Sequence, residues 1–214
     1  MVKLKWWGQA CFEIRNKKTV VIDPHDGTGI GLPSPKIIAD IVLISHGHYD
    51  HADGLPLVSS KSTTIVDKAG KRDIQGVKVE AIESFHDSAG GKLRGKNLIF
   101  LCEIDRLTIC HLGDLGHVPT EAQLKKMKNV DVLLLPVGGV YTIDASEATL
   151  TMEKVNPKIT IPMHYKIPGL NIDIAGVEPF LKGKNNVKKI GKAEVDILKS
   201  KLPSTPEIWV LKAG

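Results

Sequence analysis

"DIVLISHGHYDHADGL", residues 40–55, joins an apolar run to a dense group of polar side chains. The run Ile41–Ile44 is short and rich in β-branched residues, which predicts a buried strand. Directly after it come four side chains that can ligate a metal ion, namely His46, His48, Asp50 and His51. Burial of a strand gives no reason to place such residues at its end, so their chemistry has to explain them.

Imidazole nitrogens and carboxylate oxygens are ligands that a zinc-like ion accepts in proteins. His46 and His48 are two residues apart, so their side chains can point the same way and share one ion. Asp50 and His51 come after the chain has turned and can face a second ion beside the first. A histidine-rich polar turn without a metal is the alternative, but clusters of this kind are typical of metal sites.

Four donors are too few for two ions, so the hypothesis requires further donors at the ends of other strands. Each candidate follows an apolar stretch of strand-like composition. The candidates are His86 in "AIESFHD", Asp114 in "CHLGDLGH" and His164 in "TIPMHY". Five of the eight histidines of the chain thereby belong to one expected site.

Short apolar segments separated by Gly, Asn, Asp or Lys predict a first half built from strands. The expected strands cover residues 2–7, 10–15, 19–23, 39–45, 62–67 and 77–84, followed by a tight hairpin of 97–104 and 106–112. Later, helices are expected over 119–129, 144–157 and 193–202, alternating with strands over 131–137, 158–165 and 207–212. Asp144 is the expected N-cap of the second helix, with Glu147 three residues on, and Pro157 ends it. One mixed α/β domain over residues 1–214 fits this order best.

The composition is that of a globular chain of 214 residues, with 42% hydrophobic and 25% charged residues. Three cysteines without a Cys-x-x-Cys pair argue against a disulfide framework and for a reducing compartment. The first residues alternate polar and apolar side chains, unlike a secretory signal. No apolar run approaches the ~20 residues of a membrane helix. We therefore expect a cytoplasmic protein with no membrane partner.

The net charge is +5, and much of the excess lies in "LKGKNNVKKIGK", residues 181–192. A basic stretch of this kind is more often a solvated surface than a patch that binds nucleic acid. We expect a small-molecule substrate and no nucleic-acid partner, and the sequence leaves a homo-oligomer open.

Taken in order, "VVIDP", "SHGHYDH", "SFHD", "HLGDLG" and "IPMHY", within residues 20–165, resemble the metallo-β-lactamase superfamily of hydrolases. The resemblance implies an α/β fold, a four-layer αββα sandwich of two mixed β-sheets flanked by helices, with two metal ions at the sheet edges. It also implies the ligand roles. The first ion would be bound by His46, His48 and His86, the second by Asp50, His51 and His164, and Asp114 would bridge the two.

Within that superfamily, "LLPVGGVYTIDASEA" (134–148) and "PKITIPMHY" (157–165) resemble a smaller branch, the L-ascorbate-6-phosphate-lactonase-like hydrolases. The opening turn of that branch usually carries a histidine where "WWGQACFEI" has Gln9. This departure concerns substrate contacts and leaves the metal ligands intact. The motif around His86 also lacks the Thr-Pro-Gly run of classical lactamases, so a β-lactam or glutathione-thioester substrate is not expected.

Two divalent ions, zinc first with manganese or iron as alternatives, can activate a water between them and polarise the bond that the water attacks. Asp50, Asp114 and His164 are the residues expected to act in catalysis. Asp23 is expected to anchor a ligand histidine, because a ligating imidazole needs a partner for its other nitrogen. His25, in an early glycine-rich loop, is a candidate for the mouth of the site. Other candidates for supporting a ligand or contacting substrate are His111, His117, Tyr141, Thr142 and Tyr165.

The sequence therefore favours a metal-dependent hydrolase of a small, anionic ester, lactone or phosphodiester. The alternatives are a nuclease of the same fold, a non-catalytic metal-binding regulator and an iron redox enzyme. No long basic arm or appended RNA-binding domain supports the nuclease. The regulator is disfavoured because every ligand position is filled. The redox enzyme is disfavoured because His48 stands where its ligand set would have a glutamate.

Overall fold

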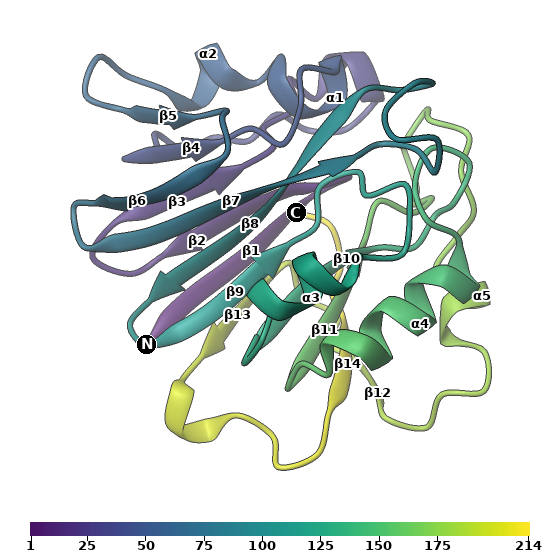
Figure 1. Ribbon diagram of the computed structural model, residues 1–214. Coiled ribbons are helices and arrows are strands. Elements are labelled where there is room, and N and C mark those ends of the chain that lie inside the picture. The colour runs from purple at the N-terminus through teal and green to yellow at the C-terminus, as the bar shows by residue number, and fades with distance from the viewer.

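The computed structural model describes residues 1–214, and its strands form two sheets that pack face to face (Figure 1). The first sheet holds, in spatial order, β13 (Glu194–Ile197), β1 (Val2–Gly8), β2 (Cys11–Arg15), β3 (Thr19–Ile22), β4 (Ile41–Leu43) and β5 (Thr64–Val66). The second holds β12 (Val187–Lys189), β14 (Glu207–Val210), β11 (Ile159–Met163), β10 (Val132–Pro136), β9 (Leu107–His111), β8 (Lys96–Ile104), β7 (Val77–Phe85) and β6 (Gly70–Ile74).

Short helices cover the outer faces of the two sheets (Figure 1). The helices α1 (Tyr49–Ala52) and α2 (Leu55–Val58) lie beside β4 and β5, at the top of the view. The helices α3 (Glu121–Lys126), α4 (Ala145–Val155) and α5 (Glu178–Leu181) lie against the second sheet. Two 3₁₀ turns, η1 (Thr28–Ile30) and η2 (Lys199–Lys201), complete the chain. The expected αββα sandwich of two mixed sheets is confirmed.

The strand β4 shows why the run Ile41–Ile44 is continuously apolar. Successive side chains of a strand point to opposite faces of the sheet. Ile41 and Leu43 join the large core between the sheets, whereas Val42 packs in a second cluster with Val58 of α2. A central strand buried on both faces therefore has no polar position.

The pairing of the strands brings their carboxyl ends to one edge of the sandwich. In the first sheet β3, β4 and β5 are parallel, and in the second β9, β10, β11, β14 and β12 are parallel. The carboxyl ends of parallel strands are where α/β sheets bind their ligands. The segments that follow β3, β4, β9 and β11 thus meet at this edge.

Several local predictions are confirmed. The hairpin of β8 and β9 turns through Asp105 and Arg106, both with positive φ, as a two-residue loop requires. Asp144 caps α4 by accepting from the backbone N–H groups of Ser146 and Glu147, and Glu147 accepts from the Asp144 N–H in return. That helix ends at Val155, two residues before Pro157.

The helix expected over residues 193–202 is wrong. The segment forms β13, which pairs antiparallel with β1, and then the 3₁₀ turn η2. Lys3 of β1 contacts both Glu194 and Asp196 across this pair, at 3.1 and 3.2 Å. Alanine, glutamate and lysine favour a helix locally, but an unpaired edge of β1 overrides a weak local preference.

The strands β6 and β12 and the helices α1, α2 and α5 have no counterpart among the sequence predictions. Each is five residues or shorter, which leaves too few positions for a periodic pattern. No helix combines the length and the apolar character that crossing a bilayer requires. The three cysteines are buried and unpaired, and burial raises the pKa of the Cys102 thiol to about 12.

Replacing Asp144 by Ala removes the acceptor for two backbone N–H groups at 2.8 and 2.9 Å. We expect the free energy of unfolding to fall by about 1 kcal/mol, the usual cost of losing an N-cap. Glu153→Ala, an exposed change near the other end of α4, is the matched control. Urea denaturation of the three proteins measures the difference, and equal stability of the two variants would contradict the capping role.

Candidate metal centre

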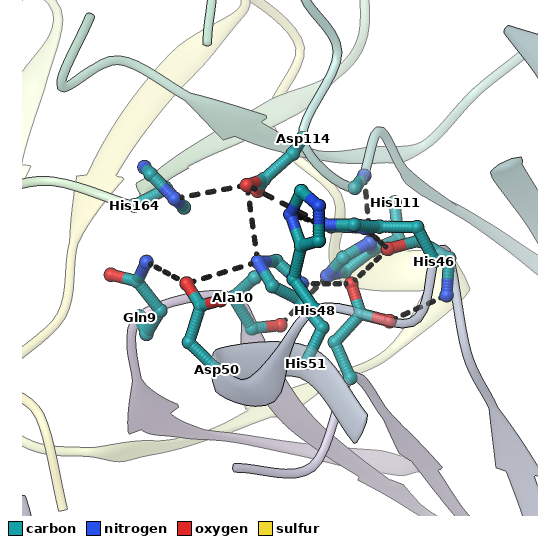
Figure 2. Close-up of polar contacts among 12 residues, drawn as sticks. Gln9, Ala10, His46, His48, Asp50, His51, His111, Asp114 and His164 are labelled. Carbon is teal, nitrogen blue, oxygen red and sulfur yellow. Dashed lines mark hydrogen bonds and ion pairs between the residues drawn. The ribbon is translucent and has the colours of Figure 1, made fainter. Parts of the chain in front are cut away.

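Seven side chains that could ligate a metal ion converge where the two sheets meet. Figure 2 shows them with the exception of His86. Each follows the carboxyl end of a strand, or lies on the short helix that follows one. Their ligand atoms fall into two groups, within each of which all atoms lie within 4.8 Å of one another. The first group is His46, His48 and His86, and the second is Asp50, His51, Asp114 and His164.

Within the first group the nitrogens already lie as neighbours. His46 Nε2 is 3.0 Å from His48 Nδ1, and the rings of His46 and His86 are 4.8 Å apart. His48 thus presents Nδ1, while His46 presents Nε2. Residues two apart can share one ion in this way, as the spacing of His46 and His48 predicts.

Asp114 belongs to the second group but also lies against the first. Its Oδ2 atom is 3.2 Å from His86 Nε2 of the first group. The same atom is 3.1 Å from His51 Nε2 and 3.2 Å from His164 Nε2, both of the second group. His46 Nε2 is slightly farther, at 3.9 Å (Figure 2). One carboxylate oxygen therefore contacts donors from both groups, as expected of a bridge.

Two features of these side chains suit a metal ion: buried polar atoms that lack hydrogen-bond partners, and the chemical type of the ligands. Asp114 Oδ1 is buried and makes no hydrogen bond within the protein, and the buried His51 Nε2 faces only the carboxylates of Asp114 and Asp50. Buried polar atoms without partners are rare and costly, and coordination would satisfy them. Five imidazoles with two carboxylates are also a ligand set that zinc-like ions accept.

Asp23 lies where the sequence analysis expects an anchor. Its Oδ2 is 2.9 Å from His51 Nδ1, so that the other nitrogen of His51 faces the cluster. The same carboxylate accepts from the Ser45 N–H and hydroxyl, both at 2.7 Å, and Ser45 Oγ contacts His46 Nδ1 at 2.9 Å. One buried carboxylate thereby orients a histidine of each group. By contrast, the buried Nδ1 atoms of His86 and His164 have no such partner.

Comparison with known proteins agrees with this site. A family profile described as "Beta-lactamase superfamily domain" matches residues 3–164. A UPF0173 metal-dependent hydrolase of Thermoplasma volcanium is 32% identical, in an alignment that covers 89% of this chain and 93% of the relative. The chain belongs to the UPF0173 family of metal-dependent hydrolases.

One further relative and one solved structure match nearly the whole chain. A UPF0173 metal-dependent hydrolase of Thermococcus onnurineus is 29% identical, covering 93% of this chain and 97% of its own. A crystal structure from Thermotoga maritima, assigned to the zinc-dependent hydrolases of the metallo-beta-lactamase superfamily, has a TM-score of 0.82 and 36% identity. It covers 99% of this chain and 98% of its own.

Gln9 forms a hydrogen bond with the candidate metal ligand Asp50 in this UPF0173 protein. Its side-chain N–H donates to Asp50 Oδ2 at 2.9 Å. Its backbone carbonyl accepts from the backbone N–H of His164 at 3.1 Å. Gln9 is fully buried. The residue that stands at the expected histidine position therefore holds Asp50 rather than lining open space.

Asn97 positions the Asp114 segment, and no sequence motif predicts this role. Its Oδ1 accepts from the Asp114 N–H at 3.0 Å, and its Nδ2 donates to the Leu112 carbonyl at 2.9 Å. Gly113 between them has a φ of +56° and packs against Asn97 so closely that a side chain would collide. Asn97 lies at the start of β8, where no local motif distinguishes it.

The other candidates occupy different places. His111 is fully buried and bonds the Ala10 carbonyl through Nε2 at 2.8 Å, so it supports the opening turn and lies outside the cluster. His117 contacts the Val118 carbonyl at 2.9 Å and Phe85 N at 3.4 Å. His25 is fully buried against the Trp7 carbonyl and does not line a mouth.

Of the three candidates from the turns after β10 and β11, one reaches the cleft. Tyr165 is 5% exposed and packs with its ring centroid 5.2 Å from that of Trp6, so it belongs to the core and is not a substrate contact. Thr142 is buried, and its hydroxyl donates to the neighbouring Ile143 carbonyl. Tyr141 is 41% exposed and lines the cleft.

Burial and neighbouring charges set the protonation states of the cluster in the absence of metal. Burial alone would raise the pKa of Asp114, but His164 and His51 hold it well below its usual value. Burial would lower the pKa of His51, but three carboxylates, Asp114 first, raise it well above. Burial and the His51 charge lower the pKa of His46 to about 3. Asp114 is thus anionic and His46 neutral at pH 7, as coordination requires. His51 carries a proton in the absence of metal and would have to release it to bind an ion.

A cleft of about 740 Å³ opens onto the candidate ligands. Its size is that of a small-molecule site. It is lined by Gly47, His48, Tyr49, Asp50, His86, Arg94, Asp114, Tyr141, His164, Asn171, Ile172 and Asp173.

Replacing Asp23 by Asn removes the charge that orients His51 and Ser45. Loss of such an outer partner weakens metal binding by about 10- to 100-fold. We expect this loss of zinc affinity in competition with a chromogenic chelator. Asp53→Asn, an exposed change at the end of α1, is the control. If both variants keep the wild-type affinity, Asp23 does not anchor the site.

Proposed function

We propose that this protein hydrolyses a small, anionic ester, lactone or phosphodiester with the help of two divalent metal ions. The observation that carries the proposal is the position of Asp114 Oδ2, within 3.2 Å of His86 from one ligand group and of His51 and His164 from the other. A carboxylate placed in this way could contact ions held by either group and would offset part of their positive charge.

Two bound divalent ions would supply an activated water and would polarise the carbonyl or phosphoryl oxygen of the substrate. His46, His48 and His86 would hold one ion, and Asp50, His51 and His164 the other. Zinc is the first choice because the donors are imidazoles and carboxylates without a thiolate, with manganese and iron as alternatives.

The protein residues have their own tasks in this proposal. Asp50 keeps one oxygen fixed by the Gln9 side chain at 2.9 Å, and its other oxygen is free to orient the attacking water. Nearby histidines, His51 first, hold the pKa of Asp50 well below its usual value even though burial alone would raise it. Asp50 therefore stays an acceptor at neutral pH. His164 is 1% exposed and its Nε2 faces Asp114.

The substrate class rests on two features. The cleft volume of about 740 Å³ suits a small molecule. A phosphorylated lactone is included because residues 134–148 and 157–165 resemble the ascorbate-6-phosphate-lactonase-like branch. A non-catalytic role is disfavoured because every proposed ligand position is filled and the cleft reaches the ligands. We place the reaction in the cytoplasm.

Asp114→Asn keeps the shape of the side chain but removes its negative charge. We expect kcat/KM for any accepted substrate to fall on the order of 10²- to 10³-fold, because activation of water depends on both ions acting together. Turnover, metal content and thermal unfolding should be measured together, after a screen of lactones, carboxylic esters and phosphodiesters has found a substrate.

His117→Ala is the matched control for Asp114→Asn, since His117 lies three residues later and outside the ligand groups. It should keep the metal and most of the activity. If Asp114→Asn stays metal-loaded and active while His117→Ala is metal-poor and inactive, the roles assigned within "GDLGH" are reversed.

Nucleic acid is the less favoured substrate. The cleft has Arg94 as its one lysine or arginine, and the basic residues 181–192 do not line it. We expect RNA binding to be weak and to be lost with modest salt, as for a diffuse basic surface. Fluorescence anisotropy of a labelled oligonucleotide at low and physiological salt measures this. Tight binding at physiological salt would support a nuclease.

A further inference from the structure

Arg94 is the one lysine or arginine in the wall of the cleft, and it has no carboxylate partner. No ion pair within the protein involves its guanidinium. Its Cζ atom lies 5.5 Å from the ring centroid of Tyr141, which also lines the cleft. An arginine with a purely structural role normally pairs with a carboxylate or with carbonyls, so this planar donor is available to a ligand.

The loop that carries Arg94 is fixed by a buried carboxylate. Asp87 is 4% exposed and directly follows the candidate ligand His86. Its Oδ2 accepts from the backbone N–H groups of Leu93 and Arg94, at 3.0 and 2.8 Å. Its Oδ1 accepts from those of Ala89 and Gly91, at 2.8 and 2.9 Å. The loop between β7 and β8 is therefore closed around Asp87, and the Arg94 backbone has a defined position relative to His86.

Exposed aromatic and apolar side chains lie in or next to the lining of the same cleft. Tyr141 is 41% exposed, and its neighbour Val140 is 62% exposed with a φ of +63°. A β-branched residue at positive φ is unusual, and such strain is concentrated at functional sites. Tyr49 on α1, 49% exposed, lines the same cleft. An arginine with two exposed aromatic rings in one cleft suits an anion that has an apolar body.

We propose that Arg94, which lies over the ring of Tyr141, binds a carboxylate or phosphate group of the substrate that is distinct from the bond being hydrolysed. This inference rests on the proposed function, because it assigns the substrate of that site a second, anionic group. Arginine presents a planar pair of N–H donors that matches both oxyanions. The loops that carry Arg94 and Tyr141, after β7 and β10, flank the ligand edge at the right of Figure 1.

The test compares two substrates and two variants on the zinc-loaded protein. The mono-4-nitrophenyl ester of glutarate carries a free carboxylate, whereas 4-nitrophenyl valerate is a neutral ester of the same chain length. Arg94→Gln should lower kcat/KM for the glutarate ester by about tenfold or more, the value of a charge-assisted hydrogen bond, mainly through KM. The valerate ester should be unaffected.

Lys92→Gln makes the same change of charge two residues away in the same loop, outside the cleft lining. It should leave both substrates unchanged, which separates a local contact from a general effect of net charge. The Arg94→Gln variant keeps the backbone N–H bond to Asp87, so the loop should stay folded. Arg94→Lys should have a kcat/KM for the glutarate ester between those of wild type and Arg94→Gln, since it keeps the charge but loses the planar pair of donors.

A binding measurement separates this inference from the proposed function. Calorimetry with phenyl phosphate on the same zinc-loaded proteins should show weaker binding to Arg94→Gln than to wild type or Lys92→Gln. If wild type hydrolyses neither ester but this difference in binding is found, the proposed reaction fails on these esters and the anion site stands. If Arg94→Gln matches wild type in binding and in the ratio of the two esters, the anion site is refuted.

Discussion

The contact of three imidazole nitrogens with Asp114 Oδ2 is the constraint on which the rest of the structure depends. The three histidines come from α1, from the end of β7 and from the end of β11, so they belong to both sheets. Groups that crowd around one oxygen at about 3 Å stay in place only if the two sheets are fixed against each other. The continuous apolar core between the sheets provides this rigidity, and Asn97 fixes Asp114 itself from β8.

The strand ends that carry the donors are bent sharply into the site. Gln9, Asp23 and His164 have φ values of 49°, 48° and 51°, which non-glycine residues seldom adopt. Such positions cost on the order of 1–3 kcal/mol each and persist where surrounding contacts hold them. Here the contacts are hydrogen bonds between the bent residues and the site, from the His164 N–H to the Gln9 carbonyl, and from Ser45 to Asp23. Strain of this kind aims each side chain at the cluster.

The donor residues could be predicted from the sequence because each sits in a short motif after an apolar strand, and strand ends of this fold meet at one edge. The hydrogen bonds that surround these donors could not be predicted from the sequence. Asn97 reaches Asp114 across 17 residues and Gln9 reaches Asp50 across 41, and neither pair leaves a local pattern. For Tyr165 the sequence predicts a contact that the structure does not have. Its position next to His164 suggests a substrate contact, but successive side chains point in opposite directions, and Tyr165 packs against Trp6 in the core. The segment 193–202 was misassigned because the free edge of β1 that it covers lies almost 200 residues earlier.

The last strands cross between the sheets, since β12 and β14 belong to the second sheet and β13 between them belongs to the first. Every candidate metal ligand precedes them in the chain, and the last of these is His164. During synthesis the donors therefore leave the ribosome while β1 and β11 still expose unpaired edges, which are templates for association with other chains. Those edges close only when residues 194–210 are in place. A nascent chain thus carries all of its candidate metal ligands before the strands that complete the two sheets have been made.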